Sequence, residues 1–176
     1  MLLDKFFKKK RIFISRHAKS SWDDLSVSDI DRVLNSRGNR DAPKMATMCA
    51  SKKYVPDCIL SSNAIRAQST ASIFANEFYG DSEMIELHPE LYLAPSETYL
   101  EVCYELDEDI QSVMIFGHNP GITVLANDIE NKLGKKHRFI TNVPTCGIIV
   151  IESKAKTWQD IDLSNCKLVD FLYPKM

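Results

Sequence analysis

Short apolar segments alternate with longer helix-like segments along this 176-residue chain, and this alternation constrains its fold more than any other feature. The apolar segments are residues 11–15, 57–62, 84–87, 112–117, 146–152 and 167–173, and the helix-like segments are residues 36–54, 64–78, 96–106 and 122–131. Such alternation predicts a mostly parallel sheet with helices on both faces. Because no helix separates the last two strands, one strand is expected to run antiparallel. The expected fold is an α/β, three-layer α/β/α sandwich of about six strands.

Individual residues predict where the helices begin. Ser36 is expected to cap the first helix. Pro43 lies inside that helix, so we expect either a kink at Pro43 or a regular helix that begins near Asp41. Asn63 is expected to cap the second helix and Asn119 the fourth.

The composition, with 44% hydrophobic and 26% charged residues, indicates a single globular domain over residues 1–176. The net charge of −2 argues against a nucleic-acid partner. No apolar stretch has the length of a membrane span, and the N-terminus lacks the pattern of a signal peptide. The five cysteines are odd in number and form neither CxxC pairs nor zinc-type spacings. We therefore expect reduced thiols, a cytoplasmic location, no membrane partner, no structural metal and no cofactor.

Basic side chains follow three of the predicted strands. Arg16 and His17 follow the first strand, Arg66 lies in the first turn of the helix after the second, and His118 follows the fourth. The carboxyl ends of parallel strands meet at one edge of the sheet, where open α/β proteins bind ligands. Two arginines, two histidines and helix N-termini at one edge favour a dianion, and phosphate matches the arginine fork. Each residue alone would be ordinary, but their convergence predicts a phosphate pocket.

Other phosphate chemistries fit the sequence less well. A cysteine phosphatase needs a cysteine five residues before an arginine, whereas seven residues separate Cys58 from Arg66. Asp29 and Asp31 match the DxDx(T/V) pattern of aspartyl-phosphate phosphatases, but no hydrophobic strand precedes them. The chain contains neither a GxxxxGK(S/T) loop nor a GxGxxG motif, so nucleotide binding by those routes is unsupported.

Motifs along nearly the whole chain resemble the histidine phosphatase superfamily, which includes the phosphoglycerate mutases. RHAKSSWD, which begins at residue 16, is similar to its branch of SixA-type phosphohistidine phosphatases. DIDRVLNSRGNRDAPKMA resembles that branch's D-x-x-R-x-L-x-x-R-G-x-x-D-A, LSSNAIRAQSTA its L-S-S-P-A-x-R-A-x-Q-T-A, and GHNPGI its second histidine motif. FITNVPTCGIIVIE and FLYPK are similar to its C-terminal third. The resemblance implies a phosphoglycerate mutase-like fold, although Asn63 stands where the pattern has proline.

The resemblance also implies roles for individual residues. His17 would be the nucleophile, and Arg16, Arg66 and His118 would complete a phosphate-binding tetrad. Lys19 is a further candidate for phosphate binding. His17 must be neutral to attack, and its cationic neighbours would lower its pKa and help to keep it so. These roles describe a metal-independent phosphatase with a phosphohistidine intermediate.

The proton donor for the leaving group bears on the substrate. Ester-cleaving members of the superfamily supply a Glu or Asp after the third strand. Glu90 and Glu97 are candidates here, but neither stands in that pattern, so we expect both to be solvated surface carboxylates. Phosphohistidine needs less help, because protonation of its remote ring nitrogen lets it depart as neutral imidazole. A compact chain without a dedicated acid therefore suits a phosphohistidine-bearing protein of the phosphorelay type.

Two alternatives remain open at the level of sequence. One is a phosphatase for a small-molecule phosphate ester, which would use the same pocket on a small phosphorylated substrate. The other is a non-catalytic phosphate-binding module. Because binding alone would not need a nucleophile, the presence of His17 argues against the second.

Overall fold

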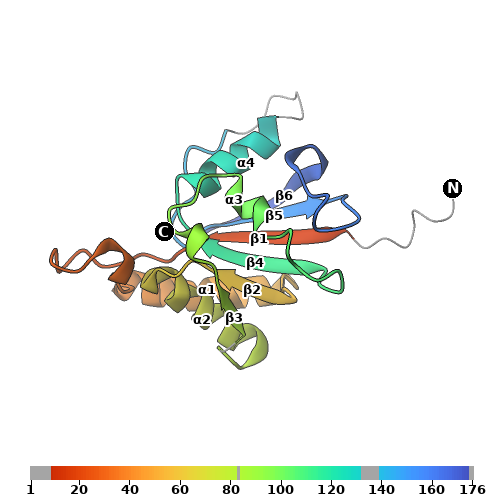
Figure 1. Cartoon of the computed structure of the whole chain (residues 1–176). Coiled ribbons are helices and arrows are strands. Elements are labelled where there is room, and N and C mark those ends of the chain that lie inside the picture. The colour runs from red at the N-terminus through yellow and green to blue at the C-terminus, as the bar shows by residue number, and fades with distance from the viewer. Residues whose placement is uncertain (1–8, 83, 132–138, 175–176) are drawn as a thin grey trace, which may run out of the picture.

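The computed structural model describes residues 9–82, 84–131 and 139–174. Its strands are β1 (Lys10–Arg16), β2 (Cys58–Ser61), β3 (Ile85–Leu87), β4 (Ser112–Gly117), β5 (Ile148–Ser153) and β6 (Cys166–Leu172). They form one sheet in the order β3-β2-β4-β1-β5-β6 (Figure 1). All six predicted strands occur, with their ends shifted by at most about two residues.

The directions of the strands agree with the predicted mostly parallel sheet. β4 pairs in parallel with both β1 and β2, and β2 pairs in parallel with β3. β5 is antiparallel to both of its neighbours, β1 and β6. β5 is therefore the single reversed strand among the described residues. The carboxyl ends of the other five strands lie at the same edge of the sheet, where a ligand site is expected.

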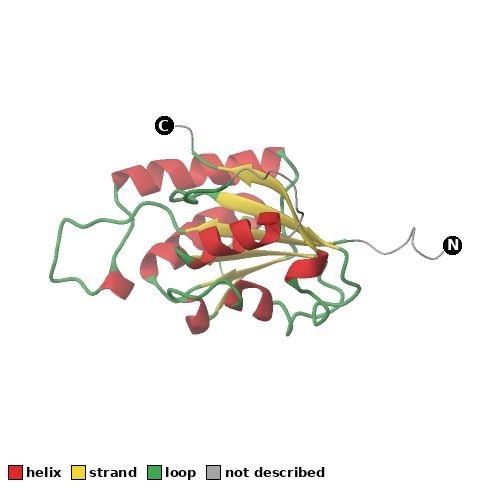
Figure 2. Ribbon diagram, turned by 90° about the horizontal axis from the view of Figure 1, so that it is seen from above, coloured by secondary structure: helices red, strands yellow, loops and turns green. Residues whose placement is uncertain are grey.

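Helices cover both faces of the sheet. They are α1 (Ser36–Ser51), α2 (Ile65–Tyr79), α3 (Thr98–Glu101) and α4 (Gly121–Asn131). α1 and α2 lie on one face, and α3 and α4 lie on the other (Figures 1 and 2). This is the predicted three-layer α/β/α arrangement.

Side chains of the central strands alternate between two buried clusters. Along β1, Phe13 packs in the cluster under α1 and α2, whereas Ile12 and Ile14 pack in the cluster on the opposite face. β4 repeats this alternation. Burying an apolar side chain of this size stabilises the fold by about 1.5–3 kcal/mol. The two clusters hold the central strands rigidly, so the loops at their ends start from fixed positions.

The start of α1 differs from the prediction. The side chain of Asn35, not Ser36, caps the helix by accepting a hydrogen bond of 2.9 Å from the Gly38 backbone N–H. The helix begins at Ser36 and continues past Pro43, which excludes the second of the two alternatives, a regular helix that begins near Asp41. The cap satisfies an N–H group that the first helical turn leaves without a partner.

The predictions for α2 and α3 also need correction. Asn63 is not a cap, because α2 starts at Ile65 and the Asn63 side-chain oxygen is buried without a hydrogen-bond partner among the described residues. The expected helix over residues 96–106 is helical only from Thr98 to Glu101. Beyond it, backbone bonds such as Cys103 N–H to the Leu100 carbonyl span three residues instead of four, and the chain tightens into turns that lead to β4.

Two further findings concern the chain as a whole. Cys49, Cys58, Cys103, Cys146 and Cys166 are not joined in disulfide bonds in the part of the chain that the structure describes. Within the described ranges, no helix combines the length and the apolar composition needed to cross a membrane.

Candidate active site

The ends of β1 and β4 bring two histidines together. The strands are parallel neighbours in which Arg16 pairs with Gly117, and each histidine is the next residue along its strand. The His17 backbone N–H donates to the Gly117 carbonyl over 3.0 Å. The imidazole centroids of His17 and His118 are 5.1 Å apart. The register of two buried strands therefore positions both rings.

Hydrogen bonds define the tautomer of His17. Its Nδ1 lies 2.7 Å from the Ala18 carbonyl oxygen, which can only accept, so Nδ1 carries the proton. Its Nε2 accepts a hydrogen bond of 3.2 Å from Arg66 Nε–H. The Nε2 lone pair thus faces the guanidinium, in the form that a nucleophile requires.

The surroundings of His17 favour its neutral form. Burial is the largest cause and lowers the pKa of His17 to about 3, with smaller contributions from His118, Arg66 and Arg16. The hydrogen bond to Ala18 acts in the opposite direction. The cationic neighbours invoked from the sequence do contribute, but removal of the ring from water contributes more.

Arg66 lies in the first turn of α2 and is only 3% exposed. Besides His17, its Nη2 lies 3.4 Å from His118 Nδ1. Its Nη1 donates to the Asp29 backbone carbonyl, and its Nη2 donates to Asp29 Oδ2 over 2.8 Å. One guanidinium therefore joins both histidines to a carboxylate. Asp29 belongs to the 3-10 helix η2 (Asp29–Asp31), not to a strand, as the sequence argument against the DxDx(T/V) motif expected.

His118 is held on its backbone and on its ring. The Tyr99 hydroxyl accepts from the His118 backbone N–H and donates to the His118 carbonyl, each over 2.9 Å. The ring Nε2 lies 2.9 Å from Ser62 Oγ. Burial first, and then Arg66, lower the pKa of His118 to about 4. In this state Nε2–H donates to Ser62, and the Nδ1 lone pair faces Arg66.

Arg16 reaches the site from the end of β1. Its Nη1 donates to the Val143 carbonyl over 2.9 Å and lies 3.4 Å from Asn142 Oδ1. Asn119 does not act as a backbone cap; its side-chain amide donates to the same two oxygen atoms, over 2.8 and 3.0 Å. The Nε–H of Arg16 is buried and has no partner among the described residues. A buried donor of this kind is available for an anionic ligand.

Lys19 stands apart from this group. Its backbone carbonyl accepts from the Asn35 N–H over 3.0 Å, and α1 approaches it so closely at Gly38 that a Cβ there would overlap the Lys19 carbonyl. Its side chain is half-buried, and no hydrogen bond or ion pair joins its ammonium group to a described residue. Phosphate binding by Lys19 stays a prediction.

The two candidate proton donors are exposed. Glu90 Oε1 lies 2.9 Å from His88 Nδ1, so this carboxylate is paired on the surface. Glu97 lines a different cavity, against α4 and residues 162–164. Neither carboxylate contacts His17 or His118, in agreement with the expectation of surface residues. Within the described ranges, no group of three or more His, Cys, Asp or Glu side chains is arranged to hold a metal ion.

Sequence reasoning gave several residues no role beside the predicted tetrad, although they contact it. They are Asp29, Ser62, Tyr92, Tyr99, Asn142 and Val143. Asp29 and Ser62 lie within motifs that carried the family resemblance, which was an available signal. Tyr92 and Asn142 come from loops whose contacts follow no sequence periodicity.

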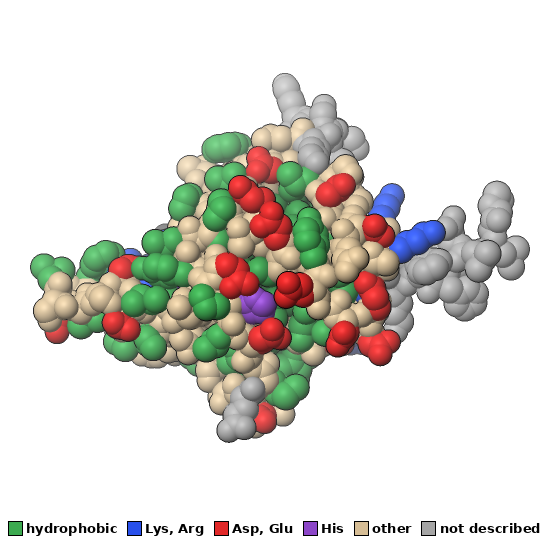
Figure 3. Space-filling view, viewed as in Figure 1, with side chains coloured by type: hydrophobic (Ala, Val, Ile, Leu, Met, Phe, Trp, Pro, Cys, Tyr) green, Lys and Arg blue, Asp and Glu red, His purple; other side chains and the backbone are tan. Residues whose placement is uncertain are grey.

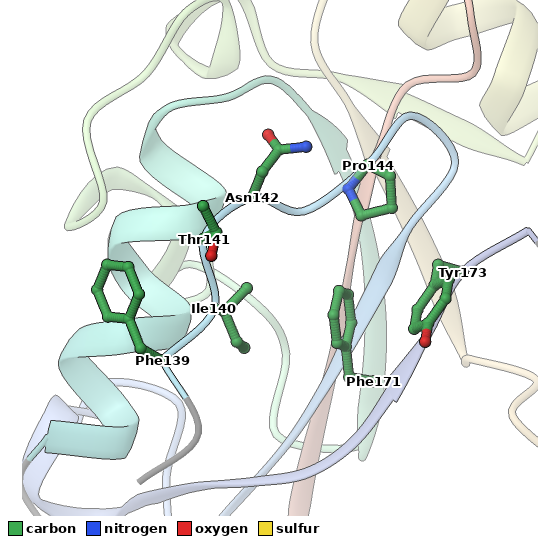
Figure 4. Close-up of a pocket in the computed structure, with 7 residues that line it drawn as sticks. All are labelled: Phe139, Ile140, Thr141, Asn142, Pro144, Phe171 and Tyr173. Atoms are coloured by element: carbon green, nitrogen blue, oxygen red, sulfur yellow. The ribbon is translucent and has the colours of Figure 1, made fainter.

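A cavity of about 320 Å³ adjoins the Arg16 side of the site (Figure 4). Asn142, which contacts Arg16, is one of its lining residues. Phe171 and Tyr173 line it from the sheet side, with ring centroids 5.2 Å apart. The space beside the phosphate-type pocket is therefore partly aromatic.

Comparisons with known proteins agree with this geometry. The family model for the histidine phosphatase superfamily (branch 1) matches residues 12–92. A SixA protein from Agrobacterium tumefaciens is 32% identical, and the match covers 94% of this chain and 98% of that one with a TM-score of 0.74. The chain belongs to the histidine phosphatase superfamily. Within the superfamily, this near full-length match identifies it as a SixA-type member.

More distant structures share the fold. The protein histidine phosphatase SixA complexed with tungstate is 21% identical, with a TM-score of 0.71 over 92% of this chain and 96% of that one. A phosphoserine phosphatase from Entamoeba histolytica is 15% identical, with a TM-score of 0.60 over 94% of this chain and 98% of that one. At these identities the likeness concerns the fold alone.

Proposed function

We propose that this protein is a phosphatase that uses His17 as a covalent nucleophile and acts on phosphohistidine carried by a protein. The observation that carries the proposal is the Nε2 lone pair of His17. The Ala18 carbonyl holds the ring in place, and the lone pair faces the buried guanidinium of Arg66. Family membership supports phosphatase activity in general. The narrower substrate rests on the arguments that follow.

Phosphate binding uses groups that are already in place. Arg16 offers its buried Nε–H, and Arg66 offers its Nε–H and Nη2–H. A bound dianion raises the pKa of His118, so that its Nδ1 becomes protonated and also donates. Four donor groups from three residues surround one phosphoryl group and neutralise its charge as it is transferred, and this is the main contribution a protein makes to such a reaction.

The reaction then proceeds in two displacements. His17 Nε2 forms a bond to phosphorus while the bond from phosphorus to the leaving atom breaks, and the leaving group keeps the electron pair. Water next attacks phosphorus, the bond to Nε2 breaks, and inorganic phosphate departs with neutral His17 restored. All charges in these steps are balanced by side chains, so the proposed activity needs no metal ion.

The absence of a well-placed acid supports a phosphoramidate substrate. Glu90 and Glu97 are exposed: Glu90 pairs with His88, Glu97 lines another cavity, and neither forms a hydrogen bond to the tetrad among the described residues. An alkoxide leaving group needs a proton from such an acid, whereas histidine protonated at its remote ring nitrogen leaves as neutral imidazole. The names of the SixA proteins agree with this substrate class.

A projecting segment beside the site supports a protein as the substrate. Residues 20–35 extend from the body of the molecule and carry hydrophobic side chains into solvent (Figures 1 and 3). Trp22 is 62% exposed and Leu25 is 85% exposed. The segment connects to the pocket through Arg32, which stacks under Trp22 and pairs with Asp29. Exposed hydrophobic side chains of this kind typically contact another macromolecule, so the segment over residues 20–35 favours a protein-borne substrate.

A phosphatase for small phosphate esters is the second candidate. One observation favours it, namely the carboxylate of Asp29 at the edge of the pocket. Small-molecule phosphatases also occur with this fold. However, although burial raises the pKa of Asp29, the hydrogen bonds from Tyr92 and Arg66 and the charges of Arg66 and Arg32 together lower it. This carboxyl is therefore ionised near neutral pH and is a poor acid.

A substrate panel tests the proposal. Purified protein is assayed on a phosphohistidine peptide, a phosphohistidine-bearing domain and a phosphate monoester. We expect the highest kcat/KM on the protein-borne phosphohistidine and a loss of roughly 10³-fold or more for His17→Ala. His88→Ala is the matched control, because His88 pairs with surface glutamates. Higher kcat/KM on the ester would contradict the proposed substrate, and an active His17→Ala variant would contradict the nucleophile.

A further inference from the structure

Asp29 holds the edge of Arg66 that faces away from the histidines. A guanidinium carries five N–H donors in a planar fork. Arg66 directs Nε and one side of Nη2 toward His17 and His118. It directs Nη1 and the other side of Nη2 toward the backbone carbonyl and carboxylate of Asp29. The plane of the guanidinium is therefore defined from two sides.

The carboxylate of Asp29 is itself fixed. Arg32 Nη1 donates to Oδ1 over 2.9 Å, and the Tyr92 hydroxyl donates to Oδ2 over 2.7 Å. Arg32 is anchored in turn by hydrogen bonds to the Ser21 carbonyl and the Ser20 hydroxyl. The carboxylate cannot rotate freely, so it transmits its position to Arg66.

Charge gives this contact a second purpose. Arg66 is 3% exposed, whereas the Asp29 side chain is 43% exposed. A buried cation is costly without a partner, and the loss of one member of a buried pair leaves the other uncompensated. Asp29 is the carboxylate that pairs with Arg66, so the guanidinium can stay in the pocket before a phosphoryl group arrives.

We propose that Asp29 is a positioning residue that orients Arg66 for phosphoryl transfer, and that it takes no part in the chemistry as an acid. The inference rests on the proposed function only for its activity assay. It gives η2 a function, because the tetrad of His17, Arg16, Arg66 and His118 does not by itself explain why this 3-10 helix packs against Arg66. Asp29 acts through Arg66, so its effect must disappear when Arg66 is absent.

A double-mutant cycle tests this dependence. Asp29→Ala should lower kcat/KM on the phosphohistidine substrate by about 10–100-fold, by analogy with the loss of residues that orient metal ligands. Asp29→Ala in an Arg66→Ala background should have almost no further effect, because the two residues act as a unit. Losses that multiply fully would overturn the proposal.

Matched variants separate positioning from a general loss of structure. Asp31 lies on the same 3-10 helix and contacts Ser28, so Asp31→Ala should leave kcat/KM unchanged. Asp29→Asn keeps an oxygen acceptor for Arg66 and should retain more activity than Asp29→Ala. Tyr92→Phe removes one donor to Asp29 and should cause a smaller loss of the same kind, which gives a readout even if Asp29→Ala fails to fold. Equal effects of Asp29→Ala and Asp31→Ala would contradict the inference.

Two further readouts complete the experiment. Calorimetric binding of orthovanadate should weaken in Asp29→Ala and not in Asp31→Ala, and this measurement needs no turnover. If the wild-type protein hydrolyses none of the substrates in the panel, the proposed function fails while the binding assay still tests Asp29. Across substrates with leaving groups of rising pKa, the loss in Asp29→Ala should stay constant. A loss that grows with leaving-group pKa would show that Asp29 is a proton donor instead.

Discussion

At the scale of the residue, burial decides the chemistry of the two histidines. Both rings lie at the carboxyl ends of the neighbouring strands β1 and β4, and burial is the first cause of the low pKa of each. The neutral form of His17 presents Nε2 as a nucleophile. Arginine neighbours add to the effect and also provide the donors that bind phosphate. A single arrangement thus keeps the nucleophile neutral and prepares the site for an anion.

The protonation of His17 and His118 gives a direct test. We expect neither ring to titrate between about pH 5 and 8 in the unliganded protein, because the pKa values are about 3 and about 4. Folding favours the neutral forms, so the contribution of both groups to stability is complete above about pH 6.5 and is lost as the pH falls toward those values. NMR titration of the ring protons, assigned with the His17→Asn variant, measures this. A midpoint near 6.5 for His17 would be incompatible with the buried, neutral ring.

The carboxylates differ from Arg66 in their expected importance. Arg66→Ala should lower the rate by on the order of 10²–10³, by analogy with the loss of an oxyanion donor. Glu90→Gln and Glu97→Gln should each change phosphoramidate cleavage by only a few fold, because both carboxylates are exposed and contact other groups. Removal of a true general acid costs about 10²–10⁴. Steady-state kinetics on one substrate compares the three variants, and a Glu variant as damaged as Arg66→Ala would move the substrate toward phosphate esters.

At the scale of the element, α3 fixes the turn between β4 and α4. Tyr99 is fully buried, and its hydroxyl bridges the backbone N–H and carbonyl of His118. Gly117 has no Cβ, and one there would overlap the Tyr99 hydroxyl. The four-residue helix α3 therefore fixes the backbone of His118 through the hydroxyl of Tyr99.

Loss of the Tyr99 hydroxyl should affect both stability and activity. Tyr99→Phe leaves the buried backbone N–H of His118 without its partner, and the His118 carbonyl keeps only the 3.5 Å bond from the Ile122 N–H. The unsatisfied N–H should lower the free energy of unfolding by about 1–3 kcal/mol. Activity should fall because the ring of His118 is less well placed. Urea unfolding and kcat/KM measure the two effects. Tyr104→Phe is the control, since the Tyr104 hydroxyl donates to the Ile161 carbonyl at the surface; equal effects of the two variants would contradict this account.

The strands were predictable and the helix ends were less so. Apolar segments such as residues 112–117 have one low-energy location, the centre of a sheet, so pattern alone finds them. Whether Asn35 or Ser36 caps α1 depends on which residue is the last with an extended backbone, and both residue types are good caps. The length of α3 depends on the path the chain must follow back to β4. These details come from tertiary packing, which outweighs local preference.

At the scale of the whole molecule, the tetrad could be predicted because its members follow strands. The sheet brings the strand ends together, and this proximity follows from its topology. The contacts of Arg66 with Asp29, 37 residues apart, and of Arg16 with Asn142, 126 residues apart, depend instead on the conformation of loops. Loop conformation follows no periodic sequence pattern. Orienting residues that come from loops, such as Tyr92 and Asn142, therefore emerge only from the structure.

The cations of the whole site are expected to be side chains. Arg16 and Arg66 converge on the pocket, with His118 available for protonation when an anion binds. Treatment with a chelator should therefore leave the turnover rate unchanged. A large loss that Mg²⁺ restores would contradict the metal-independent mechanism and would favour an aspartate nucleophile.

The central claim is that His17 carries the phosphoryl group during turnover. Rapid quenching of the enzyme with a ³²P-labelled phosphohistidine substrate measures this most directly. The account predicts label that is stable in base, labile in acid, located on His17 by peptide mapping and absent from the His17→Ala variant. Label on Asp29, Asp31 or a cysteine, or full turnover by His17→Ala, would contradict it.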